Sequence, residues 1–203
     1  MTVSLDKAAD MGPSTVTDAQ STTTKKPQHD IVVEMASIKD VKAMADVGAR
    51  SFDAMTGGSV PEADLEVFMA ANYSDAAMAA ELQCPEKLTL VARTQDDDAV
   101  VGIIQLVRGE TDSCLQGDAS EKCCLQKLYV DPSVQGKGVG TKLIVALEER
   151  ARAEKFKEIW LTVWEENSQA QKLYERLGYR KVGKKGFWLG TCHQNDWVCV
   201  KAL

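Results

Sequence analysis

The 203-residue sequence predicts one α/β domain, and three observations carry that prediction. Short apolar runs typical of strands alternate with segments whose apolar residues recur at helical spacing. Two of the strand-like runs, residues 88–92 and 100–107, are joined by the polar turn Gln95–Asp98, which is typical of an antiparallel hairpin. A third run, at about 123–131, leads through a glycine-rich turn into an amphipathic helix. A chain of this length can bury a full core.

The folded domain is expected to occupy residues 29–203. Residues 1–28 are rich in Ser, Thr, Lys and Gln and contain almost no large apolar side chains, which predicts a disordered tail. The domain opens with a short strand at 31–35. After the hairpin and a polar excursion at 109–122, the expected order is a strand at 123–131, a helix from Gly138 to Glu154, a strand from Glu158 to Trp164, a helix from Ser168 to Leu177, and strands at 179–188 and 197–201.

Two helical stretches are expected between the first strand and the hairpin. Ser37 is a suitable N-cap for the first helix, and Gly57 ends it. The second begins after Pro61, breaks at Ser74 and resumes to about Leu82.

The composition excludes several classes of protein. No apolar run is long enough to span a bilayer, and the N-terminus lacks the basic region and apolar block of a secretory signal, so we expect a cytoplasmic protein without a membrane partner. The net charge of −6, from 24 basic and 30 acidic residues, disfavours nucleic acid as a partner. The six cysteines form no C-x-x-C pair and there are two histidines, so no metal site is expected.

The segment Gln135–Thr141 offers a row of nearly bare backbone amides where a helix begins. Such a place attracts phosphate oxygens, because free N–H groups and the positive end of the helix dipole coincide there. The dinucleotide fingerprint fails because Thr141 stands where the third glycine is needed. The P-loop fails because Gly140 is followed by Thr-Lys rather than Lys-Thr. What remains is Q-x-x-G-x-G at residues 135–140, preceded by the strand pattern L-x-V-x-P at 128–132.

A second motif lies further along the chain. Residues 167–179 read N-x-x-A-x-x-x-Y-x-x-x-G-Y, in which Asn167, Ala170 and Tyr174 recur at helical intervals and share a face. Asn167 stands at the mouth of this helix, where its amide can hold a polar ligand chain. Ala170 is small enough to let a ligand lie close. Taken alone, Tyr174 would be interpreted as a core tyrosine.

Together the two motifs resemble those of the GNAT superfamily of N-acetyltransferases, over about residues 30–203. The resemblance implies a mixed, mostly antiparallel sheet of six or seven strands flanked by helices, with splayed central strands forming the cleft for acetyl-CoA. It also implies direct acetyl transfer to an amine, with Tyr174 protonating the departing thiolate. The residues that it assigns to acetyl-CoA are Leu128, Tyr129, Val130, Gln135, Gly136, Lys137, Gly138, Val139, Gly140, Thr141, Asn167, Ala170 and Tyr174.

The general base is left open by the sequence. Some superfamily members use a glutamate on the central strand, but here that strand alternates Cys124, Gln126, Leu128 and Val130 with Leu125, Lys127 and Tyr129, and neither face has an acid. Glu165, Glu166 and a water relay are the candidates, although both glutamates can equally be exposed loop charges. His193 is expected in a surface turn.

The expected acceptor is a small cationic amine. Residues 51–86 contain seven acids and no Lys or Arg, which favours a cationic ligand, although a solvated helical face would look the same: Asp53, Glu62, Asp64, Glu66, Asp75, Glu81 and Glu86. Several segments, including Ile159–Asn167 and Phe187–Asp196, resemble PaiA-type spermidine/spermine N-acetyltransferases. The alternatives are acetylation of a protein lysine or N-terminus, and a non-catalytic acyl-CoA-binding sensor. A homodimer is compatible with the edge strands of this fold.

Overall fold

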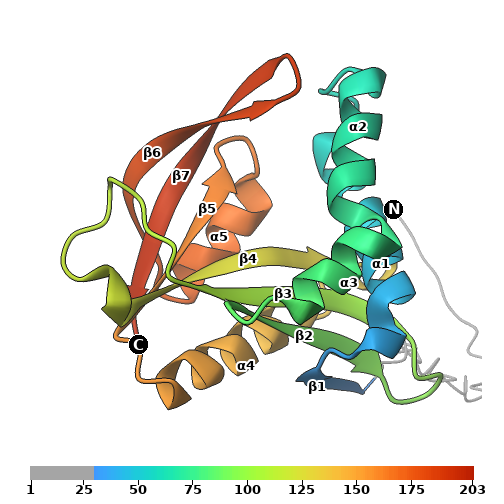
Figure 1. The fold of residues 1–203 in the computed structure, drawn as a ribbon, viewed down its shortest axis with the longest axis horizontal. Coiled ribbons are helices and arrows are strands. Elements are labelled where there is room, and N and C mark those ends of the chain that lie inside the picture. The colour runs from blue at the N-terminus through green and yellow to red at the C-terminus, as the bar shows by residue number, and fades with distance from the viewer. Residues whose placement is uncertain (1–29) are drawn as a thin grey trace, which may run out of the picture.

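The computed structural model describes residues 30–203, in which one seven-stranded sheet carries helices on both faces (Figure 1). The expected tail, residues 1–28, lies outside the described residues. The strands follow the spatial order β1-β2-β3-β4-β5-β7-β6. They are β1 (Ile31–Met35), β2 (Lys87–Thr94), β3 (Val100–Arg108), β4 (Lys122–Val130), β5 (Glu158–Trp164), β6 (Arg180–Leu189) and β7 (Cys192–Ala202).

The sheet is mixed, with one parallel pair among the described strands. β4 runs parallel to β5, and every other neighbouring pair is antiparallel. This confirms the expected mixed, mostly antiparallel sheet. The expected hairpin is formed by β2 and β3, where Leu88 lies opposite Leu106 and Leu90 opposite Ile104.

Five α-helices connect the strands within the described residues, and their ends follow the local signals in the sequence. Gly57 ends the first helix in the left-handed conformation, at φ 54. Ser74 separates the second and third helices, and its hydroxyl accepts a hydrogen bond from the Ala77 N–H at 3.3 Å. The helices are α1 (Val41–Thr56), α2 (Glu62–Tyr73), α3 (Asp75–Gln83), α4 (Val139–Ala153) and α5 (Ser168–Arg176).

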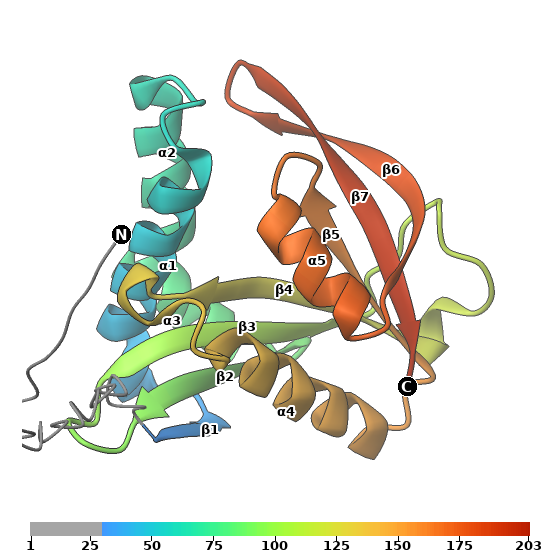
Figure 2. The same cartoon turned by 180° about the vertical axis from the view of Figure 1, so that it is seen from behind.

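The two faces of the sheet are covered by different sets of helices. α4 and α5 pack on one face, and α1, α2 and α3 pack on the other (Figures 1 and 2). The apolar stripe of α4 is fully buried as expected, with Leu143, Ile144 and Leu147 at 0% exposure. No helix of residues 30–203 combines the length and the hydropathy needed to cross a membrane.

Two expected boundaries differ from the structure. The first helical turn after Ser37 is a 3₁₀ turn at Ile38–Asp40, because the Asp40 carboxylate folds back to accept from the Ser37 N–H at 2.8 Å. The last strand begins at Cys192 rather than near Trp197, and His193 therefore lies in β7 instead of a turn. The segment Cys192–Asp196 lacks an apolar run, and its strand conformation comes from pairing with β6.

Candidate active site

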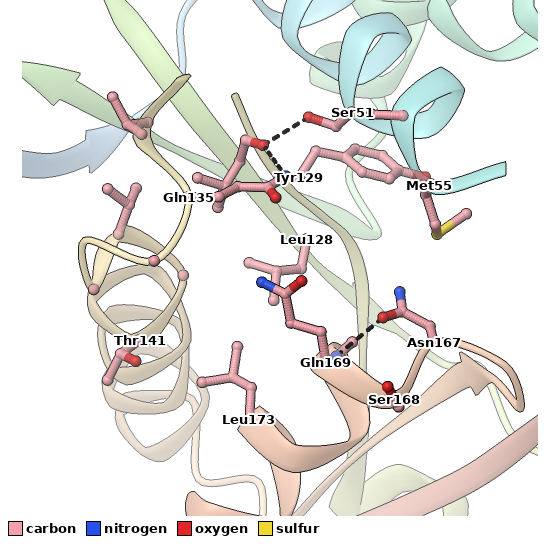
Figure 3. Close-up of a pocket in the computed structure, with 18 of the residues that line it drawn as sticks. Ser51, Met55, Leu128, Tyr129, Gln135, Thr141, Asn167, Ser168, Gln169 and Leu173 are labelled. Atoms are coloured by element: carbon pink, nitrogen blue, oxygen red, sulfur yellow. Dashed lines mark hydrogen bonds between the residues drawn. The ribbon is translucent and has the colours of Figure 1, made fainter. Parts of the chain in front are cut away.

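A cleft opens where β4 and β5 separate. Their parallel ladder joins Lys122–Cys124 to Glu158–Trp160 and then stops, while β5 stays paired with β7 over its whole length. The gap leads into a cleft of about 780 Å³, whose walls come from β4, the start of α4, α5 and α1 (Figure 3). Beyond Cys124, therefore, no described strand pairs with the β5-facing edge of β4.

A β-bulge in β4 accompanies the separation. Gln126 lies opposite Gln105 and Tyr129 opposite Ile103, so three steps along β4 match two along β3. Lys127, at φ 52, is the residue that adopts the left-handed conformation. The splayed central strands implied by the superfamily resemblance are thereby confirmed.

The bulge also corrects the alternation expected for β4. Leu125, Leu128 and Val130 all pack with the core beneath α4, whereas Tyr129 packs with the core beneath α1. Leu125 was expected on the face opposite Leu128, and that expectation was wrong. One extra residue in a strand moves every later side chain to the other face.

The glycine loop between β4 and α4 forms one wall of the cleft. Gly136 and Gly138 have φ angles of 75 and 83, a region that favours glycine. A Cβ atom at either position would meet nothing within 4 Å, so these glycines serve the backbone conformation rather than tight packing. Gly138 is the N-cap of α4, and the residues of the first turn, whose amides have no partner within the helix, line the cleft. This wall is a suitable cradle for phosphate oxygens.

The expected loop residues line the cleft with one exception. Lys137 is exposed, and its ammonium lies 3.2 Å from the Ser133 carbonyl oxygen. The loop residues that line the cleft are Gln135, Gly136, Gly138, Val139, Gly140 and Thr141.

The end of β4 is held by the predicted loop residue Gln135 and by Arg50 and Ser51, which sequence reasoning missed. The Val130 carbonyl accepts hydrogen bonds from the Ser51 hydroxyl and the Gln135 side-chain amide, each at 3.0 Å (Figure 3). Arg50 donates to the Asp131 carboxylate at 2.7 Å. These bonds tie α1 to the turn after β4, across separations of 79 and 81 residues. In the sequence, only the polar pair Arg50-Ser51 within a helix could have indicated that α1 binds the turn after β4.

Asn167 caps α5 and faces the cleft. Its side-chain oxygen accepts from the Ala170 N–H at 3.0 Å, and its side-chain nitrogen points into the cleft in Figure 3. Ala170 and Leu173 line the same wall. The expected placement of Asn167 at the mouth of this helix is borne out, and its oxygen is used for capping.

Tyr174 is buried in the core and does not line the cleft. Its ring packs edge-on against Tyr179, with centroids 5.5 Å apart, and only 6% of the residue is exposed. Its hydroxyl forms no hydrogen bond with the residues described. Burial raises the pKa of the phenol, and the neighbouring Cys199 and Tyr129 act in the same direction. Tyr174 therefore stays protonated through the physiological range.

The two glutamates after β5 differ in their surroundings. The Glu165 carboxylate accepts from the Lys184 ammonium at 2.7 Å and from the Asn195 amide at 3.0 Å. These hydrogen bonds lower the pKa of Glu165, which weakens it as a base. Glu166 is exposed and lines the cleft beside Trp164.

Two of the seven acids between residues 51 and 86 already have partners. The Asp64 carboxylate accepts hydrogen bonds from Thr191. Glu81 lies 2.7 Å from the Lys87 ammonium and 3.5 Å from that of Lys127. Burial raises the pKa of Glu81, but the hydrogen bond from Lys87 and the charge of Lys127 outweigh it, so the net pKa is lowered.

Comparison with known proteins identifies the family. The model of the "Acetyltransferase (GNAT) family" matches residues 61–179. An uncharacterized N-acetyltransferase of Mycobacterium tuberculosis is 32% identical over 164 residues, which cover 81% of this chain and 98% of the relative. The chain belongs to the GNAT family. As a GNAT enzyme it is an N-acetyltransferase with acetyl-CoA as cosubstrate.

Solved GNAT structures share the fold. The PaiA N-acetyltransferase of Thermoplasma acidophilum, solved with coenzyme A, superposes with a TM-score of 0.68 at 21% identity and covers 86% of this chain and 99% of its own. The ribosomal-protein-S18-alanine N-acetyltransferase of Escherichia coli gives 0.62 at 17% identity, covering 85% and 94%. A spermine/spermidine N(1)-acetyltransferase of Bacillus subtilis is 38% identical over 64 residues, or 31% of this chain and 42% of that protein.

Proposed function

We propose that this GNAT enzyme transfers the acetyl group of acetyl-CoA directly to the primary amine of a small cationic acceptor such as a polyamine. The observation that carries the proposal is a single cleft with two unlike ends. One end is walled by the glycine loop and the first turn of α4, and the other is lined by Met55, Tyr129, Trp164 and Glu166. The partial similarity to a spermine/spermidine N(1)-acetyltransferase supports the choice of acceptor.

The pyrophosphate of acetyl-CoA is assigned to the amides of Gln135–Thr141. The positive φ angles of Gly136 and Gly138 turn successive N–H groups toward one side, and the α4 dipole adds partial positive charge. A Cβ at Gly140 would make only ordinary contact with Leu173 at 3.5 Å, so packing within the protein does not require glycine at this position. Lys137 is not needed in this assignment, because its ammonium is turned toward Ser133.

The pantetheine arm is assigned to the open edge of β4 and to Asn167. With the ladder to β5 interrupted, Leu128 and Tyr129 have main-chain groups that can pair with an extended amide chain as a strand would. The Val130 carbonyl is the exception, because Ser51 and Gln135 already donate to it. The side-chain nitrogen of Asn167 is the donor from the facing wall.

Acetyl-CoA supplies an acyl thioester, and the proposed role of Tyr174 is to give its phenolic proton to the sulfur as the C–S bond breaks. The raised pKa keeps that proton in place until it is needed. The free hydroxyl is consistent with a donor, since no described group competes for its proton. Its burial means that the leaving sulfur must come close to the inner end of the cleft.

Glu166 is the proposed acidic residue at the acceptor end. An alkyl ammonium has a pKa of ~10.4 and must lose a proton before it attacks. Glu166 lines the cleft with an exposed carboxylate, and it can attract the ammonium and pass its proton to water. Glu165 is disfavoured because Lys184 and Asn195 already engage its carboxylate.

Steady-state assays of thiol release from acetyl-CoA test this function. Spermidine, spermine and uncharged primary amines of similar length should be compared with a lysine-containing peptide and a peptide with a free N-terminus. We expect saturable turnover with the polyamines and a higher kcat/KM for cationic than for uncharged amines. Preferred turnover of a peptide would favour a protein acetyltransferase, and acetyl-CoA binding without turnover of any amine would favour the sensor.

A further inference from the structure

The tip of the β6–β7 hairpin packs against α2, above the gap between β4 and β5. Leu189, at the end of β6, is 1% exposed and belongs to the core cluster of α1, α2 and α3. The ring of Phe187 meets that of Phe68 edge-on, with centroids 6.2 Å apart. Figures 1 and 2 show the hairpin tip leaning toward α2 in both views. Two elements more than a hundred residues apart are thereby joined.

Polar contacts fix the same junction. The Asp64 carboxylate of α2 accepts from the Thr191 N–H at 2.9 Å and from the Thr191 hydroxyl at 2.6 Å. Gly190 lets them meet, because a Cβ at that position would lie 2.1 Å from the Asp64 carboxyl carbon. Its φ of 55 also favours glycine. We call the contact of Asp64 and Phe68 with residues 187–191 the clasp.

The clasp completes a ring around the acceptor end of the cleft. α1 is tied to the end of β4 through the hydrogen bond from Ser51 to Val130. β5 is paired with β7 along its length, and β7 continues into the hairpin. Because the hairpin tip binds α2, the contacts form a closed ring. It runs from β4 to α1 and α2, on to the hairpin, and back through β5 to β4. Met55 of α1 and Trp164 of β5, two elements of this ring, both line the cleft.

We propose that the clasp, with Asp64 and Thr191 as its specificity-determining residues, limits acceptors to slender, unbranched amines that can pass through a closed ring. A terminal aminoalkyl chain can enter such an opening, whereas a lysine on a folded protein brings its neighbouring backbone against the hairpin. This inference rests on the proposed function, because it assigns the acceptor to that end of the cleft.

Two binding probes test the clasp without requiring turnover. One is coenzyme A joined through an acetyl bridge to the terminal amine of spermidine. The other carries the same bridge on a surface lysine of a small folded protein. In calorimetry, the wild-type protein is expected to bind the spermidine conjugate at least ~10-fold more tightly than the protein conjugate. Equal binding of the two conjugates by the wild-type protein would overturn the proposal.

Variants in the clasp sharpen the test. Asp64→Ala removes both hydrogen bonds, and Thr191→Val removes the hydroxyl while keeping the N–H. Each variant is expected to bind the protein conjugate about threefold or more tightly than the wild type does, with its affinity for the spermidine conjugate unchanged. The ratio of the two dissociation constants should fall by the same factor. Glu66→Ala is the matched control, because Glu66 is exposed on the same helix and forms no hydrogen bond or ion pair with the described hairpin residues.

The outcomes separate the clasp from the proposed function. An unchanged preference in both folded clasp variants, verified by thermal melting, would refute the role of Asp64 and Thr191. If Asp64→Ala does not fold, Thr191→Val decides alone. The wild-type protein could prefer the spermidine conjugate and yet acetylate no amine. That result would support the role of the clasp and contradict the proposed function.

Discussion

The two ends of the cleft are built in different ways. The donor end comes from two continuous segments, residues 128–141 and 167–177, and its shape is set mainly by their backbone conformation. The acceptor end is assembled by side chains that meet over long separations, such as Asp64 and Thr191 across 127 residues. The donor end is therefore recognisable in the sequence, whereas the acceptor end exists only after folding.

Gly138→Glu should abolish acetyl-CoA binding in calorimetry, with a loss of more than ~100-fold. The substitution forces a side chain onto a φ of 83 and puts a carboxylate beside the assigned pyrophosphate. Gly138→Ala is the control that keeps the backbone strain without the charge, and it should retain weakened binding. Normal binding of coenzyme A by a folded Gly138→Glu variant would show that the loop is not the donor site.

Tyr174→Phe should lower kcat by about 10²-fold or more while leaving the affinity for coenzyme A unchanged. The ring would still pack on Tyr179, so the fold should persist. Because the phenol works in its protonated form and burial raises its pKa, activity in the wild type should be lost only above the ordinary phenol range. Wild-type kcat in the Phe variant would remove Tyr174 from the mechanism.

Tyr179→Phe is the matched control for Tyr174. It deletes a buried hydroxyl that donates to Glu148 at 3.1 Å and has no part in the proposed proton transfer, while the ring stays packed against Tyr174. Thermal melting should show destabilisation, whereas kcat should stay within about twofold of wild type.

Glu166→Gln should lower kcat/KM for cationic acceptors by about 3- to 10-fold and change that for uncharged amines less. Glu165→Gln should change either value by less than about threefold, since its carboxylate is committed to a solvent-exposed pair with Lys184. The comparison uses the same assay and two adjacent residues. A larger effect at Glu165 would reverse the assignment of the acidic residue.

Glu81→Gln should lower the free energy of unfolding by about 1–2 kcal/mol at neutral pH and should have a smaller effect on activity. It leaves the half-buried Lys127 ammonium without its carboxylate. The folded-state pKa of Glu81 is lowered, so its contribution is present above the unfolded value of ~4.3 and is lost as pH falls through the folded pKa. Denaturant titrations should therefore show that the difference in unfolding free energy between wild type and variant becomes smaller as the pH is lowered. A difference that does not depend on pH would contradict this account.

The sequence predicted what depends on local backbone and missed what depends on contacts at a distance. The helix limits at Gly57 and Ser74, the loop Gln135–Thr141 and the cap at Asn167 all follow from short patterns. The β4 faces were misassigned because Lys127, a bulky residue, takes a conformation that its type does not signal.

The acceptor end shows the same limit. The acidic stretch between residues 51 and 86 was counted as free charge, yet Asp64 binds the hairpin turn and Glu81 is paired with lysines. No local pattern marks Thr191 or Lys127 as their partners. Which acids remain free to meet a ligand is decided by tertiary packing.

A crystal structure with the coenzyme A–spermidine conjugate would test the central claim most directly. We predict the pyrophosphate on the amides of Gln135–Thr141 and the polyamine chain leaving between Met55 and Glu166, with the hydrogen bonds from Thr191 to Asp64 intact. A conjugate whose amine portion leaves the cleft elsewhere, or whose binding requires the hairpin to detach from α2, would contradict the account.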